Sequence, residues 1–404
     1  MTQLARRLPY VTLVALFGGY AASYFHRADL ATIAPLWAAD PRHTALRAAW
    51  PDLASLGMLV YALGKLLGGI LAERFGGRVV FPAALAGAGA AELVAMHADD
   101  VGTFAACRVA GMVVLGCAWP ALGQVVANVT PVQRLATVMA FLSQSYLLGD
   151  AAVRALLAAV VARGGDAHAV FGTAATGLLT AAGIVAMTLW CTRRPHATGN
   201  PSPAATATAT APPGVLRLLL ALAAMNFALA LVREALSLWT PLLLVERCGL
   251  PADAAVRASA LLPLASGAGA LLAGPLADRG PRTLLAVTLL PALLAAIALG
   301  TLAAASAPAL PFVLGATALA SALLVMPMTL ASGVLPLRIA RTGGARRLGF
   351  VDGAGSFGAV LAGSALARVQ TSFGANGMFA GLAAVATLAA AFAFVVHRHH
   401  VART

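Results

Sequence analysis

The stretches "GKLLGGILAERFGGR", residues 64–78, and "GAGALLAGPLADRGPR", residues 267–282, decide the fold because they carry one pattern twice. Each contains the core G-x-L-A-[E/D]-R, which begins at Gly69 in the first stretch and at Gly274 in the second. In both places a long apolar segment precedes the core. The two halves of the chain therefore repeat one another.

A second landmark recurs in the same register. "RADLATIAP" begins at Arg27 and "REALSLWTP" begins at Arg233, so both read as Arg, seven residues, Pro. Arg27 precedes Gly69 by 42 residues, and Arg233 precedes Gly274 by 41. Two landmarks at matching distances indicate an internal duplication.

The composition is that of a polytopic membrane protein. Of the 404 residues, 60% are hydrophobic and only 10% are charged, whereas a soluble protein carries about 25% charge. The net charge of +13 would suit nucleic acid, but the basic residues fall mostly in short loops, so we expect no nucleic-acid partner. The four cysteines are scattered without metal-ligand or disulfide spacing. We predict no metal, no cofactor and no enzymatic activity, and no ATP-hydrolysing motif is present, so a gradient must supply the energy.

Twelve apolar segments are long enough to cross about 30 Å of hydrocarbon as helices. The predicted spans are 9–37, 50–72, 79–97, 104–128, 135–161, 170–191, 215–244, 257–277, 283–304, 308–334, 349–367 and 373–396. We predict an all-α membrane protein with twelve transmembrane helices in two six-helix bundles related by pseudo-two-fold symmetry.

The loops predict the domain boundaries and the orientation. Residues 192–214 are rich in Pro, Ala and Thr, as expected of a flexible linker. This linker separates an N-terminal bundle, residues 1–191, from a C-terminal bundle, residues 215–404. Most Lys and Arg residues fall on the side of the N-terminus, so the positive-inside rule predicts two cytoplasmic termini. The absence of a transit peptide suits a bacterial inner (plasma) membrane.

Four cations are predicted inside the spans: Arg27, Lys65, Arg154 and Arg233. An ionisable group at mid-membrane costs roughly 2.5–3.5 kcal/mol on insertion scales, and such groups mark pathways. Helical spacing places further polar side chains beside these cations. The neighbours are Tyr20 and Tyr24 for Arg27, Tyr61 for Lys65, and Asn226 for Arg233.

This set predicts a binding site for a small anion. Two guanidiniums can grip a phosphate or a carboxylate through paired hydrogen bonds, and tyrosines add donors. Asp29 and Glu234 lie close in sequence to Arg27 and Arg233. Residues one or two apart do not share a helix face, so we expect these local ion pairs to be poor.

Twelve spans as six plus six are similar to the major facilitator superfamily, whose signature resembles residues 64–78. More narrowly, "GYAASYFHRADLATIAP", "YALGKLLGGILAERFGGR", "LVREALSLWTPLLL" and "GFVDGAGSFGAVLAGSALA" resemble spans 1, 2, 7 and 11 of the organophosphate:phosphate antiporters. That family includes glycerol-3-phosphate and hexose-6-phosphate transporters. The resemblance implies phosphate binding by Arg27 and Arg233, exchange of organic for inorganic phosphate, and rocker-switch alternating access.

The fifth span departs from that family. Glycerol-3-phosphate transporters carry a substrate histidine there, and Ser145 stands in its place. Asp150 and Arg154 form an i, i+4 pair near the middle of the span. Two readings stay open: a self-neutralising pair buried against a neighbouring helix, or a third anion-binding arginine with a proton-linked aspartate.

Other ionisable groups are candidates for coupling or gating. A buried carboxylate at Glu234 or Asp29 can carry a proton, which would suit proton symport. His26 is turned about 100° from Arg27 along the helix, and its two readings are a titrating group and a packed interhelical hydrogen bond. We read Glu92 as structural, and the role of Asp352 stays open.

The charged residues of the repeated motif are predicted to form a conformational latch at the cytoplasmic helix ends, not a substrate site. They are Glu73, Arg74 and Arg78 in the first copy, and Asp278, Arg279 and Arg282 in the second.

We therefore predict a secondary active transporter in the lipid bilayer, as a monomer. Its partners would be a small anionic substrate (a phosphate ester or a carboxylate) and inorganic phosphate or a proton. The first hypothesis is an organophosphate antiporter, and the second is a proton-coupled symporter of carboxylates or sugar acids. A metabolite or drug exporter and a non-transporting sensor are further alternatives, which the paired cations and the short tails disfavour.

Overall fold

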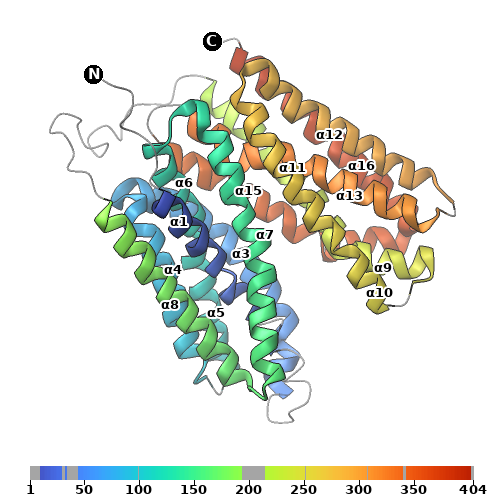
Figure 1. The fold of residues 1–404 in the computed structure, drawn as a ribbon. Coiled ribbons are helices and arrows are strands. Elements are labelled where there is room, and N and C mark those ends of the chain that lie inside the picture. The colour runs from blue at the N-terminus through green and yellow to red at the C-terminus, as the bar shows by residue number, and fades with distance from the viewer. Residues whose placement is uncertain are drawn as a thin grey trace, which may run out of the picture. The chain divides into compact units, whose positions relative to one another are not determined.

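The computed structural model describes residues 10–29, 32–33, 44–98, 100–192, 214–250, 252–306, 308–339 and 343–401, and within these ranges the chain is helical without strands (Figure 1). Ten helical stretches in these ranges are long and apolar enough to cross a membrane. Two predicted spans are not among them. Span 1 is only partly described. The predicted span 349–367 falls mostly on the helix Gly344–Leu361, which holds three charged residues among its 18. The all-helical, multi-span fold predicted from the sequence is confirmed.

The chain divides into two compact units. Unit 1 comprises Met1–Pro131, Leu142–Ala209 and Ala340–Gly353, and unit 2 comprises Val132–Phe141, Thr210–Ile339 and Ala354–Thr404. Each unit thus includes a short segment from the other half of the sequence. The predicted domain boundaries stay a prediction, and nearly all of the predicted linker lies outside the described residues.

Unit 1 is built from the N-terminal helices. These are α1 (Tyr10–Ala22), α3 (Thr44–Phe75), α4 (Gly77–Ala95), α5 (Val101–Gly116), α6 (Ala118–Val129), most of α7 (Leu135–Ala162) and α8 (Ala167–Cys191). The main packing is of α4 on α5 and α8, and of α3 on α5. Glycines permit the α3–α5 contact, because a Cβ on Gly64 would clash with the carbonyl oxygen of Val113.

Unit 2 is built from the C-terminal helices. These are α9 (Val215–Cys248), α10 (Ala252–Ser259), α11 (Leu261–Asp278), α12 (Pro281–Ala304), α13 (Leu310–Thr329), the π-helical turn η5 (Leu330–Val334), α14 (Leu335–Arg338) and α16 (Ser364–Val401). The helix α12 packs on α13 and α16, and α9 packs on α13 and α16. The short η3 (Val132–Arg134) and the start of α7 also belong to this unit.

Several predicted spans are interrupted. Span 1 breaks at Ser23 and Tyr24, which form a turn between α1 and helical residues 25–29. Span 4 is divided into α5 and α6 at Cys117. The helix α16 runs through the predicted loop between spans 11 and 12 and bends at Gly374, whose φ of 66° favours glycine. The helix α15 (Gly344–Leu361) begins in unit 1 and ends in unit 2.

Candidate functional site

Unit 1 brings three tyrosines and Arg27 together, and we call Tyr20, Tyr24, Arg27 and Tyr61 the tyrosine–arginine cluster. The Nη1 of Arg27 donates to the Tyr24 hydroxyl at 2.8 Å, and the hydroxyls of Tyr20 and Tyr61 are 3.3 Å apart. The guanidinium lies 4.6 Å from the ring centre of Tyr24 and 5.0 Å from that of Tyr61. The tyrosines are buried and Arg27 is half-buried. The cluster is a cation framed by phenol rings and hydroxyls.

The turn at residues 23–24 sets the position of Arg27. Helix α1 stops at Ala22, and the Ser23 hydroxyl donates to the Tyr20 carbonyl at 2.6 Å. The helix resumes at residue 25, so the stretch from Tyr20 to Arg27 passes through a turn and is not one regular helix. Arg27 contacts Tyr24, as predicted, although the helix used for that prediction is interrupted. Tyr20 joins the cluster through the hydroxyl of Tyr61.

Lys65 extends the cluster toward α15. Its ammonium lies 5.0 Å from the ring centre of Tyr61 and 2.7 Å from a carboxylate oxygen of Asp352. Both charged side chains are only 10% exposed. Helices α3 and α15 approach closely here: a Cβ added to Gly349 would clash with the carbonyl oxygen of Lys65. The structure thus pairs Lys65 with the carboxylate whose role the sequence left open.

A second group, the buried ionic cluster, consists of His26, Asp29, Glu92 and Arg108. The Nη1 of Arg108 donates to the two Asp29 oxygens at 2.8 and 3.0 Å and lies 3.4 Å from Glu92. The Nδ1 of His26 contacts Glu92 and lies 3.4 Å from Arg108. None of the four is more than 2% exposed. Span 1, α4 and α5 are thereby joined through charged groups.

Among the residues that the structure describes, Arg108 contacts both carboxylates of this cluster. Two carboxylates and one guanidinium leave one excess negative charge, and burying an uncompensated charge is costly. One bound proton would neutralise this excess charge. His26, Asp29 and Glu92 place three potential metal ligands within 4.8 Å of one another. Arg108 already occupies the space between the carboxylates, so the donor set favours a proton over a metal ion. His26 was read from the sequence as either titrating or packed, and the structure packs it between helices.

Sequence reasoning missed Arg108. It lies inside the predicted span 104–128, but it was not counted among the in-span cations. A count of charged residues within that span would have found it. Glu92 and Asp29 were noted, but their shared partner was not.

The expectation that Arg233 and Glu234 would make only a poor ion pair is wrong. The Nη2 of Arg233 lies 2.7 Å from the Glu234 carboxylate, and the two side chains are 26% and 34% exposed. Adjacent residues do point in different directions from a helix. Both side chains are long and partly exposed, so they bend toward one another over the surface of α9. Asn226, its predicted helical neighbour, is fully buried beside Gly355.

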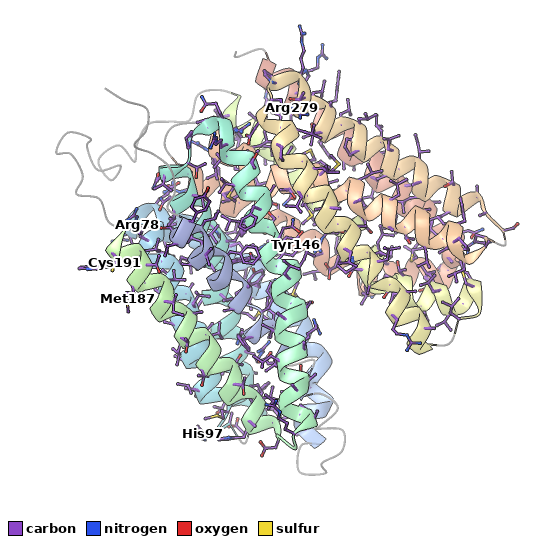
Figure 2. The ribbon with its side chains drawn as sticks, in the orientation of Figure 1. Arg78, His97, Tyr146, Met187, Cys191 and Arg279 are labelled. Atoms are coloured by element: carbon purple, nitrogen blue, oxygen red, sulfur yellow. The ribbon has the colours of Figure 1, made fainter. Side chains whose placement is uncertain are left out.

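The fifth span shows a formed ion pair. Arg154 Nε lies 2.8 Å from Asp150, with side chains 52% and 35% exposed. Arg154 and Asp150 thus neutralise one another, as one of the two readings expected. The burial against a neighbouring helix that this reading also expected is wrong. Ser145 is fully buried, and its hydroxyl donates to the Leu142 carbonyl at 2.5 Å. Tyr146 lies on the same helix (Figure 2).

In each copy of the repeated motif, the carboxylate accepts from the start of another helix. Asp278 accepts from the backbone N–H groups of Ala136 at 3.2 Å and Thr137 at 2.8 Å, in the first turn of α7. Glu73 accepts from the backbone N–H of Arg346 at 3.0 Å, in the first turn of α15. The Glu73 contact lies within unit 1, and the Asp278 contacts lie within unit 2. A helix N-terminus attracts a carboxylate through its free N–H groups and its dipole.

The remaining motif residues behave differently. Arg78 donates to the Leu189 carbonyl at 3.2 Å and so ties α4 to α8. The guanidinium of Arg74 lies over the Phe75 ring at 5.3 Å. Arg279 is exposed at the end of α11 (Figure 2). Arg282 is exposed in the first turn of α12. The structure therefore gives the motif carboxylates helix-capping contacts, while the predicted latch function stays a prediction.

Comparison with known proteins decides the family. The major facilitator superfamily model matches residues 16–345, which is most of the chain. The chain belongs to the major facilitator superfamily. It is therefore a multi-pass membrane transporter, as the sequence predicted. Comparison with curated proteins finds no match.

Solved structures share the fold at low identity. The proton:xylose symporter XylE superposes with a TM-score of 0.72 at 16% identity, covering 95% of this chain and 94% of that one. FucP, crystallised in an outward conformation, gives 0.73 at 15% identity, covering 95% and 98%. The human organic anion transporter MFSD10 gives 0.70 at 16% identity, covering 96% and 100%. These likenesses concern the fold alone, and the resemblance to organophosphate antiporters stays a prediction.

Proposed function

We propose that this transporter moves a small organic anion and that Arg27 binds it. The supporting observation is the tyrosine–arginine cluster. A guanidinium keeps its charge in proteins and offers five N–H donors in a planar fork, and the Nη1 of Arg27 donates to the Tyr24 hydroxyl. The surrounding phenols exclude water and add hydroxyl donors, so an anion bound here gains charge-assisted hydrogen bonds in a poorly solvated place.

Two ion pairs qualify the roles of the other predicted anion-binding cations, Lys65 and Arg233. Lys65 is 2.7 Å from Asp352, and Arg233 is 2.7 Å from Glu234. An anion that approaches either cation also meets a carboxylate. We therefore assign Lys65 and Arg233 a conditional role, in which they bind the anion only when their own carboxylate partner moves or takes a proton.

Two substrate classes fit the chemistry of Arg27. A phosphate ester exchanged for inorganic phosphate is the first, and it rests on the resemblance of spans 1, 2, 7 and 11. A carboxylate or sugar acid is the second. In either case we place the transporter in a plasma membrane with both termini in the cytoplasm, on the strength of the positive loops.

Proton coupling is the second candidate mode, and the buried ionic cluster favours it. Among the described residues the group holds two carboxylates and one guanidinium, so a bound proton would balance its charge, and XylE is described as a proton symporter. Residues 25–29 carry both functions, because His26 and Asp29 belong to the ionic cluster and Arg27 to the tyrosine–arginine cluster. A shift of this short segment about the turn at residues 23–24 would link anion binding to proton binding.

Uptake into proteoliposomes tests the substrate and the mode together. Vesicles are loaded with inorganic phosphate or left empty, and a panel of labelled phosphate esters and carboxylates is presented outside, with and without an inward proton gradient. Variants Arg27→Gln and Arg154→Gln are compared, the second being a matched loss of one in-span arginine.

Each outcome has a defined reading. Uptake that needs internal phosphate supports exchange. Uptake that needs the proton gradient and ignores internal phosphate supports symport. Arg27→Gln should abolish uptake in both cases, whereas Arg154→Gln should retain it. Uptake of cations only, or uptake by Arg27→Gln at the wild-type rate, would overturn the anion proposal.

A further inference from the structure

The turn at Ser23 and Tyr24 separates residues 25–29, which carry Arg27, from the regular helix α1. In this turn the backbone N–H groups of Ser23 and Tyr24 donate to carbonyls three residues back, each at 3.1 Å. Bonds within a regular α-helix reach four residues back. The regular helix of α1 therefore does not determine the direction of Arg27, and contacts with other helices of unit 1 have to position this segment.

The ring of Phe25 packs directly on α8. A Cβ added to Gly177 would clash with three atoms of the Phe25 ring, so the ring lies against the backbone of that glycine. The same ring is partly buried and packs against a core cluster that includes Phe171 of α8. A larger residue at position 177 would therefore displace the ring, and the packed core limits the directions in which the ring can move. We call this interaction the Gly177 contact.

The next residue, His26, packs on α5. A Cβ added to Gly111 would clash with Cε1 and Nε2 of the His26 ring, so this ring also lies against a glycine backbone. The Nδ1 of His26 contacts Glu92 and lies 3.4 Å from Arg108. Asp29 adds a further link to α5 through Arg108, at 2.8 and 3.0 Å. Residues 25–29 are thus held by α5 as well as by α8.

These two ring contacts orient Arg27. Successive side chains on a helix point about 100° apart, so the direction of Arg27 follows once Phe25 faces α8 and His26 faces α5. In that direction the Nη1 of Arg27 donates to the Tyr24 hydroxyl at 2.8 Å, and the guanidinium lies 5.0 Å from the ring centre of Tyr61. A binding group that is held in place in advance loses less conformational freedom when its ligand arrives.

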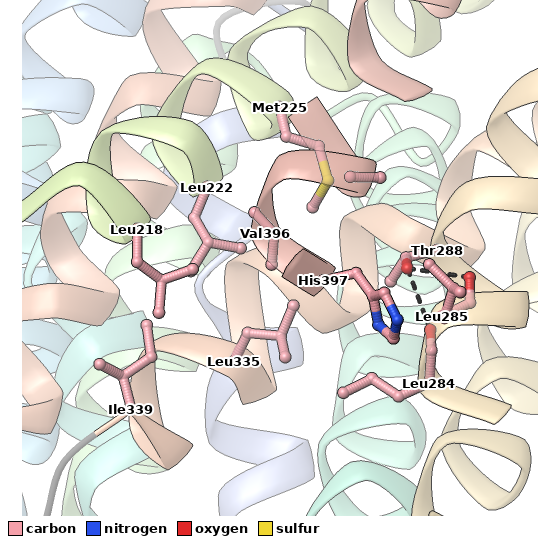
Figure 3. A pocket seen from close by; sticks show the side chains of 11 residues that line it. Leu218, Leu222, Met225, Leu284, Leu285, Thr288, Leu335, Ile339, Val396 and His397 are labelled. Carbon is pink, nitrogen blue, oxygen red and sulfur yellow. Dashed lines mark hydrogen bonds between the residues drawn. The ribbon is translucent and has the colours of Figure 1, made fainter. Parts of the chain in front are cut away.

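The apolar pocket of unit 2, between α9, α12, α14 and α16, offers no comparable partner for an anion (Figure 3). Among its described lining side chains, Thr288 carries the only hydroxyl group, which already donates to the carbonyls of Leu284 at 3.0 Å and Leu285 at 3.1 Å. Apart from Thr288 and His397, the lining side chains are aliphatic or Met. We therefore expect the anion at Arg27 and not in this pocket.

We propose that Phe25 is a positioning residue for anion binding, because its ring in the Gly177 contact holds Arg27 in the direction that meets the anion. The inference rests on the proposed function and adds α8 as a regulator of the same site. Helix α8 acts on the anion through Phe25 and Arg27. Because His26 and Asp29 belong to the same segment, a shift of α8 would move Arg27 and the buried ionic cluster together.

Hydrogen exchange of the purified full chain in detergent tests the Gly177 contact without any ligand. Gly177→Ala should speed the exchange of the backbone amides of residues 25–29 by about tenfold, because the displaced ring loosens its own segment. The matched control is Gly183→Ala on the same helix, where an added Cβ has no atom within 4 Å, and its exchange should equal that of wild type. The double variant Gly177→Ala/Phe25→Leu makes room for the added methyl group and should return the exchange to within about threefold of wild type.

Equilibrium binding of two labelled probes, inorganic phosphate and glucuronate, tests the positioning role. For the probe that wild type binds, Gly177→Ala should raise the Kd about tenfold, because a displaced binding group loses affinity. Gly177→Ala/Phe25→Leu should recover most of this loss, while Phe25→Leu alone should bind more weakly than wild type. Gly183→Ala should keep the wild-type Kd. Thermal unfolding of each variant identifies any that fail to fold.

The outcomes separate this proposal from the proposed function. Wild-type exchange and affinity in Gly177→Ala would overturn the positioning role of Phe25. Faster exchange with unchanged affinity would also overturn it, because the Gly177 contact would then be structural only. If wild type bound neither probe, the proposed function would fail, and the exchange of residues 25–29 would still show whether the Gly177 contact holds this segment.

Discussion

Arg108 donates to both carboxylate oxygens of Asp29, at 2.8 and 3.0 Å, although 79 residues separate the two in the sequence. This contact is the centre of the buried ionic cluster and joins span 1 to α5. A fully buried cation between two carboxylates has few alternative partners, so the cluster depends on every member.

Removing Arg108 should therefore be severe. We expect Arg108→Gln to lower the free energy of unfolding by about 3–5 kcal/mol, because Asp29 and Glu92 are left buried without their cation. Thermal unfolding in detergent measures the loss. The triple variant Asp29→Asn/Glu92→Gln/Arg108→Gln should recover most of it. The exposed pair offers a control, and Arg154→Gln should change stability by less than about 1 kcal/mol.

If the triple variant lost more unfolding free energy than Arg108→Gln alone, the three charges would not be coupled.

The helix caps of the repeated motif should differ in strength. Asp278 accepts from two backbone N–H groups, from the Thr137 hydroxyl at 2.7 Å and from Arg338 at 2.6 Å. Glu73 accepts from the backbone N–H of Arg346 and lies 3.4 Å from its Nε. We expect Asp278→Ala to cost about 2–4 kcal/mol and Glu73→Ala about 0.5–1 kcal/mol, measured by thermal unfolding. A larger loss for Glu73→Ala would contradict this ranking.

Close packing at Gly349 gives a third expectation. An added Cβ there would clash with the Lys65 carbonyl, so Gly349→Ala should destabilise by about 1–3 kcal/mol. Gly381 in α16 has open space around it, and Gly381→Ala should stabilise by about 0.5–1 kcal/mol through the higher helix propensity of alanine. Chemical or thermal unfolding distinguishes the two signs. Destabilisation of similar size in both variants would argue against the α3–α15 contact.

Lys65 and Asp352 should act as one unit. Each side chain is 10% exposed, so loss of either partner leaves a desolvated charge. We expect Lys65→Met and Asp352→Asn each to reduce transport and stability. The double variant should lose less unfolding free energy than the two single variants added together, and the difference should be about 1–3 kcal/mol. Strict additivity in a double-mutant cycle would show that the pair contributes no mutual energy.

The sequence predicted what depends on local pattern and on repetition. Long apolar segments gave the spans, and the duplicated motif gave the family. Tyr24 and Arg27 were correctly brought together because they lie within one helical turn of one another. Even so, the turn at residues 23–24 was not visible in the apolar pattern.

The remaining contacts are long-range, and no local signal encodes them. Arg108 meets Asp29 only because α5 packs beside span 1, and Lys65 meets Asp352 only because α15 packs on α3. The Arg233–Glu234 pair was excluded by reasoning from Cβ directions, which neglects the reach of two long, partly exposed side chains. Predicting these pairs requires the three-dimensional arrangement of the helices.

Equilibrium binding to Arg27 variants tests the proposed function most directly. The ligand is whichever labelled anion competes best in the uptake assay, and the proteins are wild type, Arg27→Gln and Arg154→Gln in detergent. A charge-assisted hydrogen bond contributes roughly 1.5–3 kcal/mol, so Arg27→Gln should raise the Kd by about ten- to a hundredfold while Arg154→Gln leaves it unchanged. Unaltered affinity in Arg27→Gln, with the protein folded, would contradict the assignment of Arg27 as the anion-binding residue.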